Sequence, residues 1–191
     1  MGRWQSVVCI ASGPSLTADD VELVRHWRMA EPESGEKRGV IVVNTTFLLA
    51  PWADALFAMD RTWWNRYHAE VDEKFIGQRF SNNAHIARYK TTCVPIMSYG
   101  NSGAAAIALA AHMNTKKIIM LGYDCKYAED GKRHWHGDHP VGLGNAGRIH
   151  LWGIKFQRLA NDISKEITVL NASRDTDLTC FPRVRLEDAL I

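Results

Sequence analysis

The sequence lacks several features that would assign it to a specialised class of protein. None of its apolar runs approaches the roughly 18–20 residues of a membrane-spanning helix. The apolar stretch near the amino terminus is too short for a signal peptide, so we expect a cytoplasmic protein with no membrane partner. The 23 Lys and Arg residues nearly balance the 21 Asp and Glu residues. A net charge of +2 gives no sign of a dedicated nucleic-acid binder.

Cysteine pairs, internal repeats and low-complexity segments are also missing. The four cysteines lie far apart and form no Cys-x-x-Cys pair, which favours free thiols in a reducing compartment. The composition, 46% hydrophobic and 23% charged, is typical of a globular protein. A length of 191 residues fits one domain, which we predict to span residues 1–191.

Strands and helices are predicted to alternate along the chain. Apolar runs predict strands at 6–11, 39–43, 55–59, 76–80, 92–96, 116–121 and 166–170. Helical spacing and capping residues predict helices over 17–27, 61–67, 101–113 and 149–163. Several strands are apolar on both faces, as in a parallel sheet covered by helices. We therefore predict an α/β, Rossmann-like domain with a mostly parallel sheet and helices on both faces.

Small and polar residues follow the predicted strands. The first strand runs into Ser12-Gly13-Pro14-Ser15, and later strands run into Asn44, Asp60 and Gly122-Tyr123-Asp124. In such a sheet, ligands bind beyond the carboxyl ends of the strands. Two predicted helix starts, near Thr17 and at Asn101-Ser102-Gly103, offer backbone N–H groups to a phosphate. We expect these loops to share one pocket. The Ser-Gly-Pro-Ser segment matches neither a Walker loop nor the Gly-x-Gly-x-x-Gly motif. An ordinary strand-to-helix turn explains this segment equally well.

A loop rich in histidine follows Asp124. His134, His136 and His139 fall within six residues, and they are typical of a general base or a metal site. A zinc site would use these three with Asp138 and Asp124, although zinc ligands usually come from two separated elements. The alternatives are a divalent ion held loosely by Asp124 and a diphosphate, or surface histidines without a function. Lys126, Lys132 and Arg133 can steady phosphate charge. The charged stretch 174–177 is predicted to be a solvated loop, and its position after the last strand places it on the edge of the sheet where a ligand would bind.

The motifs in this order resemble a known superfamily. Ser12-Gly13-Pro14-Ser15-Leu16, Asn44, Asn101-Ser102-Gly103 and Gly122-Tyr123-Asp124 are similar to motifs of the single-domain bacterial sialyltransferases. They also resemble the Maf flagellin-glycosylation proteins and the archaeal hydroxymethylpterin diphosphokinase-like proteins. The His-Trp-His-Gly-Asp-His-Pro loop is similar to that of short members carried by tailed bacteriophages. Ala11-Ser12 departs from the Gly-Asn that the sialyltransferases have before their Gly-Pro-Ser.

The resemblance implies a nucleotide site. The nucleotide-binding residues would be Ser12, Gly13, Pro14, Ser15, Asn44, Asn101, Ser102, Gly103, Gly122, Asp124 and Tyr127. The resemblance assigns no catalytic histidine, because that of the sialyltransferases lies further downstream. From the residues themselves, we expect His134, His136 and Asp124 to be catalytic, and Lys132 and Arg133 to assist the phosphate. A protein of this kind would work in the cytoplasm of a bacterial host and can be phage-encoded.

These observations favour a glycosyltransferase-like enzyme. We expect a CMP- or UDP-linked nucleotide sugar as donor, with or without Mg²⁺, and a hydroxyl acceptor deprotonated by a histidine base. The alternatives are a Mg²⁺-dependent diphosphokinase or nucleotidyl-type enzyme using ATP, a non-catalytic phage nucleotide-binding module, and a metal-dependent hydrolase. Phage DNA, a cell-surface glycan and a small metabolite all remain open as acceptors. A homo-oligomer is compatible with the sequence.

Overall fold

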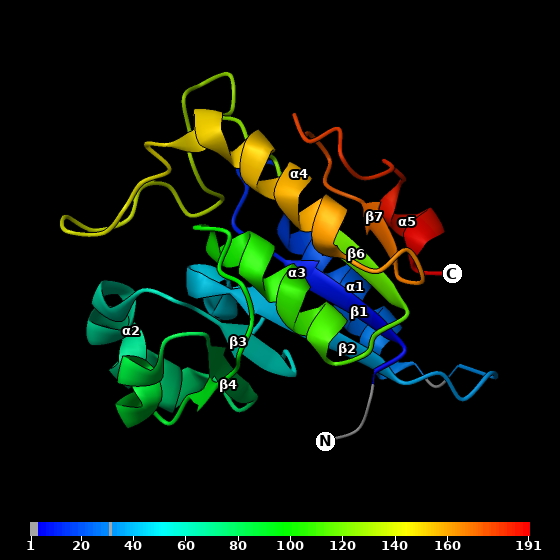
Figure 1. Ribbon diagram of the computed structural model, residues 1–191, viewed down its shortest axis with the longest axis horizontal. Coiled ribbons are helices and arrows are strands. Elements are labelled where there is room, and N and C mark those ends of the chain that lie inside the picture. The colour runs from blue at the N-terminus through cyan, green and yellow to red at the C-terminus, as the bar shows by residue number, and fades with distance from the viewer. Residues whose placement is uncertain (1–3, 31) are drawn as a thin grey trace.

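The fold is built on one parallel sheet, seen in a computed structural model that describes residues 4–30 and 32–191 (Figure 1). The described residues form seven strands in the order β5-β4-β3-β2-β1-β6-β7, and every pairing is parallel. The strands are β1 (Ser6–Ile10), β2 (Arg38–Val43), β3 (Ala55–Phe57), β4 (Gln78–Ser81), β5 (Thr92–Cys93), β6 (Lys117–Leu121) and β7 (Thr168–Asn171). The predicted α/β, Rossmann-like class is confirmed.

Helices cover both faces of the sheet. The α-helices are α1 (Ala18–Met29), α2 (Arg61–Lys74), α3 (Ser102–His112), α4 (Trp152–Asp162) and α5 (Leu186–Ala189). Three short 3₁₀ helices among the described residues are η1 (Asn44–Leu48), η2 (Ala84–Tyr89) and η3 (Ile149–Leu151). Helices α1, α2 and α5 pack on the face that carries Val8 and Ile10. Helices α3 and α4 pack on the opposite face, which carries Val7 and Cys9. Since successive strand side chains point to opposite faces, strand β1 is buried on both sides.

Several predicted element boundaries were wrong. Helix α2 continues past Tyr67 to Lys74, because Val71 extends its buried stripe by one turn beyond the aromatic residues. Strand β4 begins at Gln78 rather than at Ile76, whose side chain is 89% exposed. Strand β3 stops at Phe57 and β5 has only two residues, so both are shorter than predicted, whereas β7 is shifted to 168–171. Helix α5 and the 3₁₀ helices η1 and η2 were not predicted, whereas η3 is the first turn of the predicted helix 149–163.

The start of helix α1 was predicted correctly from its capping residues. Thr17 accepts a hydrogen bond from the Asp20 backbone N–H, and the Asp20 carboxylate accepts one from the Thr17 N–H, which makes a capping box. Arg174 also donates to the Asp20 carboxylate, at 2.8 Å. The amino end of α1 is therefore capped by the protein's own side chains.

The strand order creates a crevice for a ligand. From β1 the chain moves outward through β2, β3, β4 and β5, and then returns through α3 to place β6 on the other side of β1 (Figure 1). The connections therefore diverge between β1 and β6. A ligand site is expected at the carboxyl ends of two such strands.

Two further observations concern the membrane and the cysteines. Within residues 4–30 and 32–191, no helix has both the length and the apolar character needed to cross a bilayer. All four cysteines are free; Cys9 is buried and Cys93 is exposed.

Candidate functional site

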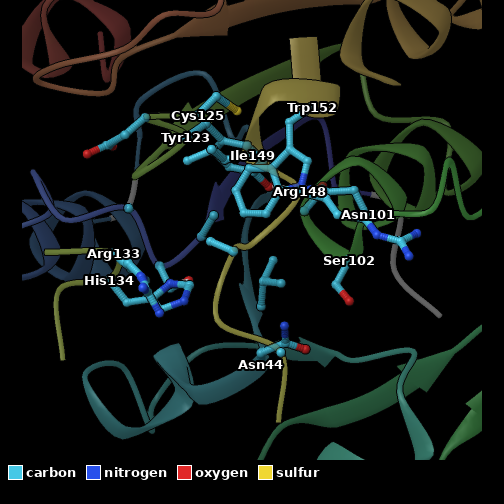
Figure 2. Close-up of a pocket in the computed structure, with 18 of the residues that line it drawn as sticks. Asn44, Asn101, Ser102, Tyr123, Cys125, Arg133, His134, Arg148, Ile149 and Trp152 are labelled. Carbon is cyan, nitrogen blue, oxygen red and sulfur yellow. Dashed lines mark hydrogen bonds between the residues drawn. The ribbon is translucent and has the colours of Figure 1, made fainter. Parts of the chain in front are cut away.

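A pocket of about 600 Å³ lies at the carboxyl ends of β1, β2 and β6 (Figure 2). Gly13, Ser102 and Asp124, which we expected to share one pocket, all line it. In Figure 2, Arg133 and His134 lie on the left of the cavity, Asn101 and Ser102 on the right, and Asn44 below. The predicted residues in its lining are Ser12, Gly13, Pro14, Asn44, Asp60, Asn101, Ser102, Gly103, Gly122, Tyr123, Asp124, Lys126, Arg133, His134 and His139.

The loops after β1 and β6 interlock at the floor of the pocket. The Gly13 N–H donates to the Gly122 carbonyl at 2.8 Å. A Cβ at Gly13 would lie 2.2 Å from Asp124 Oδ1 and 2.6 Å from the Gly122 oxygen. Gly122 has a φ of +72°, and a Cβ there would lie 2.8 Å from the Ala11 oxygen. Glycine is therefore required at both positions by the close approach of the two chains.

The loop after β1 does not cradle a phosphate in the predicted way. Its N–H groups at Gly13 and Ser15 already donate to the Gly122 carbonyl and to Asp124 Oδ2, and Pro14 has no N–H. Thr17 and the first turn of α1 do not line the pocket. The helices whose first residues do line it are α3, at Ser102 and Gly103, and α4, at Trp152. The prediction of two helix starts at the site was therefore wrong for α1, whose place is taken by α4.

The start of α3 is fixed by two contacts. The Asn101 side chain caps the helix by accepting from the Ala104 N–H at 3.1 Å. The Tyr123 hydroxyl, from the loop after β6, donates to the Gly103 carbonyl at 3.2 Å. Ser102 stands in the first turn with a buried hydroxyl. The amino end of α3 is thus held against the β6 loop, with its positive dipole end at the pocket.

Asp124 is the most perturbed acid of the site. Its side chain is 2% exposed, and its Oδ2 accepts from the Ser15 N–H at 2.7 Å. Burial raises the pKa of Asp124 to about 6, against the opposing effect of the hydrogen bonds from Ser15. A carboxyl group with this pKa exchanges its proton near neutral pH, as a general base or acid must.

Buried polar atoms without partners concentrate in this pocket. In the part of the chain that the structure describes, eight buried side-chain oxygen or nitrogen atoms have no hydrogen-bond partner. Five of them belong to residues that line the pocket: Asn44 Oδ1, Ser102 Oγ, Asp124 Oδ1, His134 Nε2 and His139 Nδ1. Since buried polar groups are nearly always hydrogen-bonded in native proteins, these atoms point to a ligand.

The loop after β6, residues 125–148, forms one wall and is tied to the rest of the site. His134 Nδ1 lies 3.0 Å from the Ser12 hydroxyl, and the Trp135 N–H donates to the Ser12 carbonyl at 3.1 Å. The Trp135 ring packs against the core. Residues 134–137 form a turn, in which the Gly137 N–H donates to the His134 carbonyl at 3.0 Å, and the rings of His134 and His136 are stacked 5.2 Å apart at 8°.

The three histidines of the loop lie together. The rings of His134 and His139 are 4.7 Å apart, as are those of His136 and His139. Burial, followed by the neighbouring histidines, lowers the pKa of His134 to about 3 and that of His136 to about 4. Burial also lowers the pKa of His139. The imidazoles are therefore neutral at physiological pH.

Five predicted residues do not line the pocket: Ser15, Tyr127, Lys132, His136 and Asp138. Ser15 instead holds Asp124 through its backbone. The half-exposed Tyr127 donates its hydroxyl to the Ala146 carbonyl at 3.0 Å, and Lys132 is exposed. Ser15 and Tyr127 therefore hold the lining residues Asp124 and Ala146 in place without lining the pocket themselves.

Sequence reasoning missed Arg148, Trp152 and Lys155 in the lining. Lys155 donates to the Gly100 carbonyl at 2.6 Å, and Arg148 makes no ion pair among the described residues. With Lys126 and Arg133 they give the lining four cations. Their only signal in the sequence is that they lie at the start of the predicted helix 149–163. Helix starts bind phosphate, so this helix start could have been proposed as part of the site in the same way as the start of α3.

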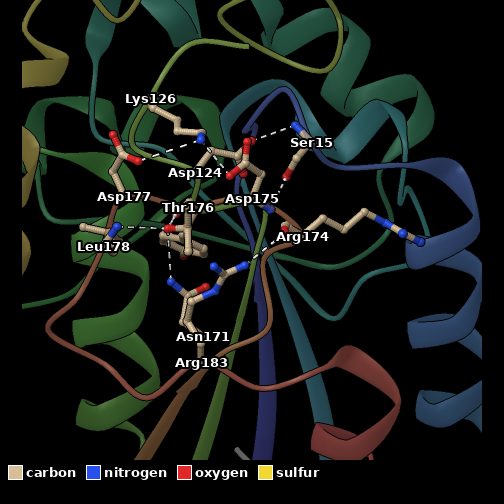
Figure 3. A network of polar contacts seen from close by, with 11 residues as sticks. Ser15, Asp124, Lys126, Asn171, Arg174, Asp175, Thr176, Asp177, Leu178 and Arg183 are labelled. Carbon is tan, nitrogen blue, oxygen red and sulfur yellow. Dashed lines mark hydrogen bonds and ion pairs between the residues drawn. The ribbon is translucent and has the colours of Figure 1, made fainter. Parts of the chain in front are cut away.

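As the sequence predicts, the stretch 174–177 is a loop whose charged residues are exposed, and it also contacts the site (Figure 3). Thr176 donates its hydroxyl to the Tyr123 carbonyl at 2.7 Å, and Asp175 pairs with Lys126 at 2.7 Å. The Asp177 N–H donates to the Asp124 carbonyl at 2.9 Å. The stretch packs against the β6 loop because strand β7 lies beside β6, so this charged segment holds Asp124 and Lys126 in place.

Fold and site together define an α/β protein of Rossmann-like fold with a polar, partly cationic pocket at the topological switch point of its sheet. None of the family models, curated proteins or solved structures compared with the chain matches it.

Proposed function

We propose that this protein is a nucleotide-dependent transferase that binds a CMP- or UDP-linked sugar in the pocket and transfers the sugar to a hydroxyl acceptor. The observation that carries the proposal is the group of unpartnered buried polar atoms in one pocket between the ends of β1 and β6. That is where parallel α/β sheets bind nucleotides. A volume of about 600 Å³ lies within the range of small-molecule sites.

The charge of the nucleotide phosphate has suitable partners. The amino end of α3 contributes the positive end of a helix dipole, and the Ser102 hydroxyl is free to donate. Arg148 and Lys155 lie in the lining beside it, and Arg133 belongs to the histidine loop. Charges placed in this way stabilise a departing phosphate more than a bound one, which accelerates the transfer.

Asp124 is the general base of the proposed reaction. The acceptor oxygen attacks the anomeric carbon, while the bond from that carbon to the phosphate oxygen breaks. The bonding electron pair leaves with the nucleotide phosphate, and the acceptor proton passes to the Asp124 carboxylate. Asp124 and His134 both line the pocket and both have an unpartnered atom, but Asp124 suits the role better because its pKa is about 6 whereas that of His134 is about 3.

Nucleotide binding is tested by thermal shift of the full chain with CMP, CDP, UMP, UDP, GDP and ATP, each with and without Mg²⁺. We expect stabilisation by a cytidine or uridine nucleotide, because a ligand that binds only the folded state raises the melting temperature. An absence of stabilisation by every nucleotide at millimolar concentration would refute the proposal.

Two hydroxyl deletions make a matched pair for this assay. Ser102→Ala and Thr115→Val each remove a buried hydroxyl without a partner, but Ser102 begins α3 in the pocket whereas Thr115 follows its other end. We expect Ser102→Ala to weaken nucleotide binding about tenfold, the value of a hydrogen bond to a charged group. Thr115→Val leaves it unchanged. Equal effects of the two variants would mean that the nucleotide binds elsewhere.

Turnover is tested by donor hydrolysis, in which water replaces the unidentified acceptor. We expect slow release of nucleotide from the matching nucleotide sugar, reduced at least about 100-fold in Asp124→Asn if this residue is the base. Tight binding without any release would favour the non-catalytic module.

A second candidate function is a Mg²⁺-dependent diphosphokinase. Asp60, whose pKa is raised by burial, lines the same pocket as Asp124, and carboxylate oxygens are the ligands that Mg²⁺ prefers. Stabilisation by ATP alone, and only with Mg²⁺, would decide for this candidate.

A further inference from the structure

The histidine loop brings three ring nitrogens to one point. His134, His136 and His139 each offer a nitrogen, and these atoms lie within 4.8 Å of one another. No other group of three or more His, Cys, Asp or Glu residues within 4–30 and 32–191 has this arrangement. We propose that these three histidines form a binding site for a divalent transition-metal ion of the zinc class.

Unpartnered atoms at the cluster support a ligand independently of the spacing. His134 Nε2, His136 Nε2 and His139 Nδ1 are buried and have no hydrogen-bond partner among the described residues. His134 is only 6% exposed. Three orphaned nitrogens in one place would be costly unless something binds them. A metal ion satisfies all three lone pairs at once.

Contacts around His134 resemble those that orient metal-binding histidines. The Ser12 hydroxyl lies 3.0 Å from His134 Nδ1, so this nitrogen is engaged and Nε2 is left for a ligand. The Asn145 side chain accepts from the His139 N–H and donates to its carbonyl. Gly137, with a φ of +85°, turns the chain between the second and third histidines. The loop is thus shaped by the protein itself.

Zinc ligands usually come from two separated elements, whereas here one loop supplies them all and the contacts of Ser12 and Asn145 hold that loop in place. The ligand set is also smaller than the sequence predicts. Asp138 pairs with Arg133 at 3.4 Å, and Asp124 accepts from the Ser15 N–H. Neither belongs to the group of three.

The donor set selects the class of ion. Imidazole nitrogen suits Zn²⁺, Co²⁺, Ni²⁺ and Cu²⁺, whereas Mg²⁺ and Ca²⁺ prefer oxygen. Three protein ligands leave one position of a tetrahedral zinc ion open. Since His134 and His139 line the pocket, that position would be available to an oxygen of a bound molecule or to water. The metal site does not depend on the proposed function, because it rests on the cluster alone.

The test is titration of the tag-free full chain, stripped with a chelator, with ZnCl₂ in a calorimeter and no nucleotide present. We expect one equivalent to bind, and an excess of Mg²⁺ not to displace it. His136→Ala should weaken binding at least about 100-fold, since even partners of metal ligands are worth 10–100-fold. The control His85→Ala removes an exposed histidine of η2, and this variant should bind zinc as the wild type does.

A spectroscopic titration covers the case in which His136→Ala does not fold. Wild-type protein loaded with Co²⁺ should give the strong visible absorption of a tetrahedral site, and His136→Gln, of similar volume, should lose it. The proposal is overturned if the wild type binds no zinc, or if His85→Ala weakens binding as much as the change at His136. The nucleotide panel, run on chelated protein, separates failure of the metal site from failure of the proposed function.

Discussion

Replacing Asp124 by asparagine should stabilise the protein, and more so at high pH. The side chain is buried, and its pKa rises from the ordinary 3.8 to about 6 because ionisation inside the fold is unfavourable. A raised pKa means that the folded state holds the proton more tightly than the unfolded state. The stability contributed by the neutral carboxyl is therefore complete below pH 3.8 and is lost as the pH rises through 6.

The magnitude follows from the two pKa values. At about 1.4 kcal/mol per unit, ionised Asp124 lowers the free energy of unfolding by about 3 kcal/mol at pH 8. By the same relation about half of this loss is already present at pH 5. The advantage of Asp124→Asn over the wild type should therefore grow by about 1.4 kcal/mol from pH 5 to pH 8.

Urea denaturation followed by circular dichroism at both pH values measures this difference. Glu129→Gln, an exposed carboxylate on the following loop, is the matched control and should show no such growth. An advantage of Asp124→Asn that stays constant, or that shrinks towards pH 8, would refute the claim that burial perturbs this carboxyl group. Loss of donor hydrolysis in the same variant would show that its destabilising charge serves the reaction.

Three further changes test separate parts of the structure. Gly13→Ala places a Cβ against Asp124 and the Gly122 carbonyl, so urea denaturation should show a loss of about 1–3 kcal/mol, together with weaker nucleotide stabilisation. Thr17→Ala removes the cap of α1 and should lower the free energy of unfolding by about 1 kcal/mol. Because Thr17 lies outside the pocket, the Thr17→Ala variant should bind nucleotide as the wild type does, and a weaker affinity would contradict the site described. Arg148→Ala should weaken nucleotide binding about tenfold in calorimetry, an effect that shrinks with added salt if the contact is ionic.

The central strands were predictable because a short, uninterrupted apolar run is typical of a strand buried in a parallel sheet. Strands β1 and β6 are runs of apolar residues buried on both faces, a pattern typical of parallel sheets. The capping box at Thr17 fixed the start of α1 by local chemistry alone. The end of α2 was missed because its last turns are polar outside and only Val71 faces the core.

The pocket was predictable only where strands end. Gly13, Asn44 and Asp124 lie within three residues of the ends of β1, β2 and β6, so the parallel sheet places them on one edge. Loop 125–148 has no periodicity, so its path could not be predicted. In the structure its end runs back along the pocket, which places Arg148 and Lys155 in the lining. Residues 174–177 were expected at the same edge because they follow the last strand, but their charge pattern did not show that they contact Asp124 and Lys126.

A crystal structure of the full chain soaked with CMP and UDP measures the central claim most directly. We expect a nucleotide between Gly13, Ser102 and Asp124, with its phosphate at the amino end of α3. A nucleotide bound in the hollow at the opposite edge of the sheet, lined by Arg28 and Asp54, would contradict the account, as would an empty pocket at millimolar nucleotide.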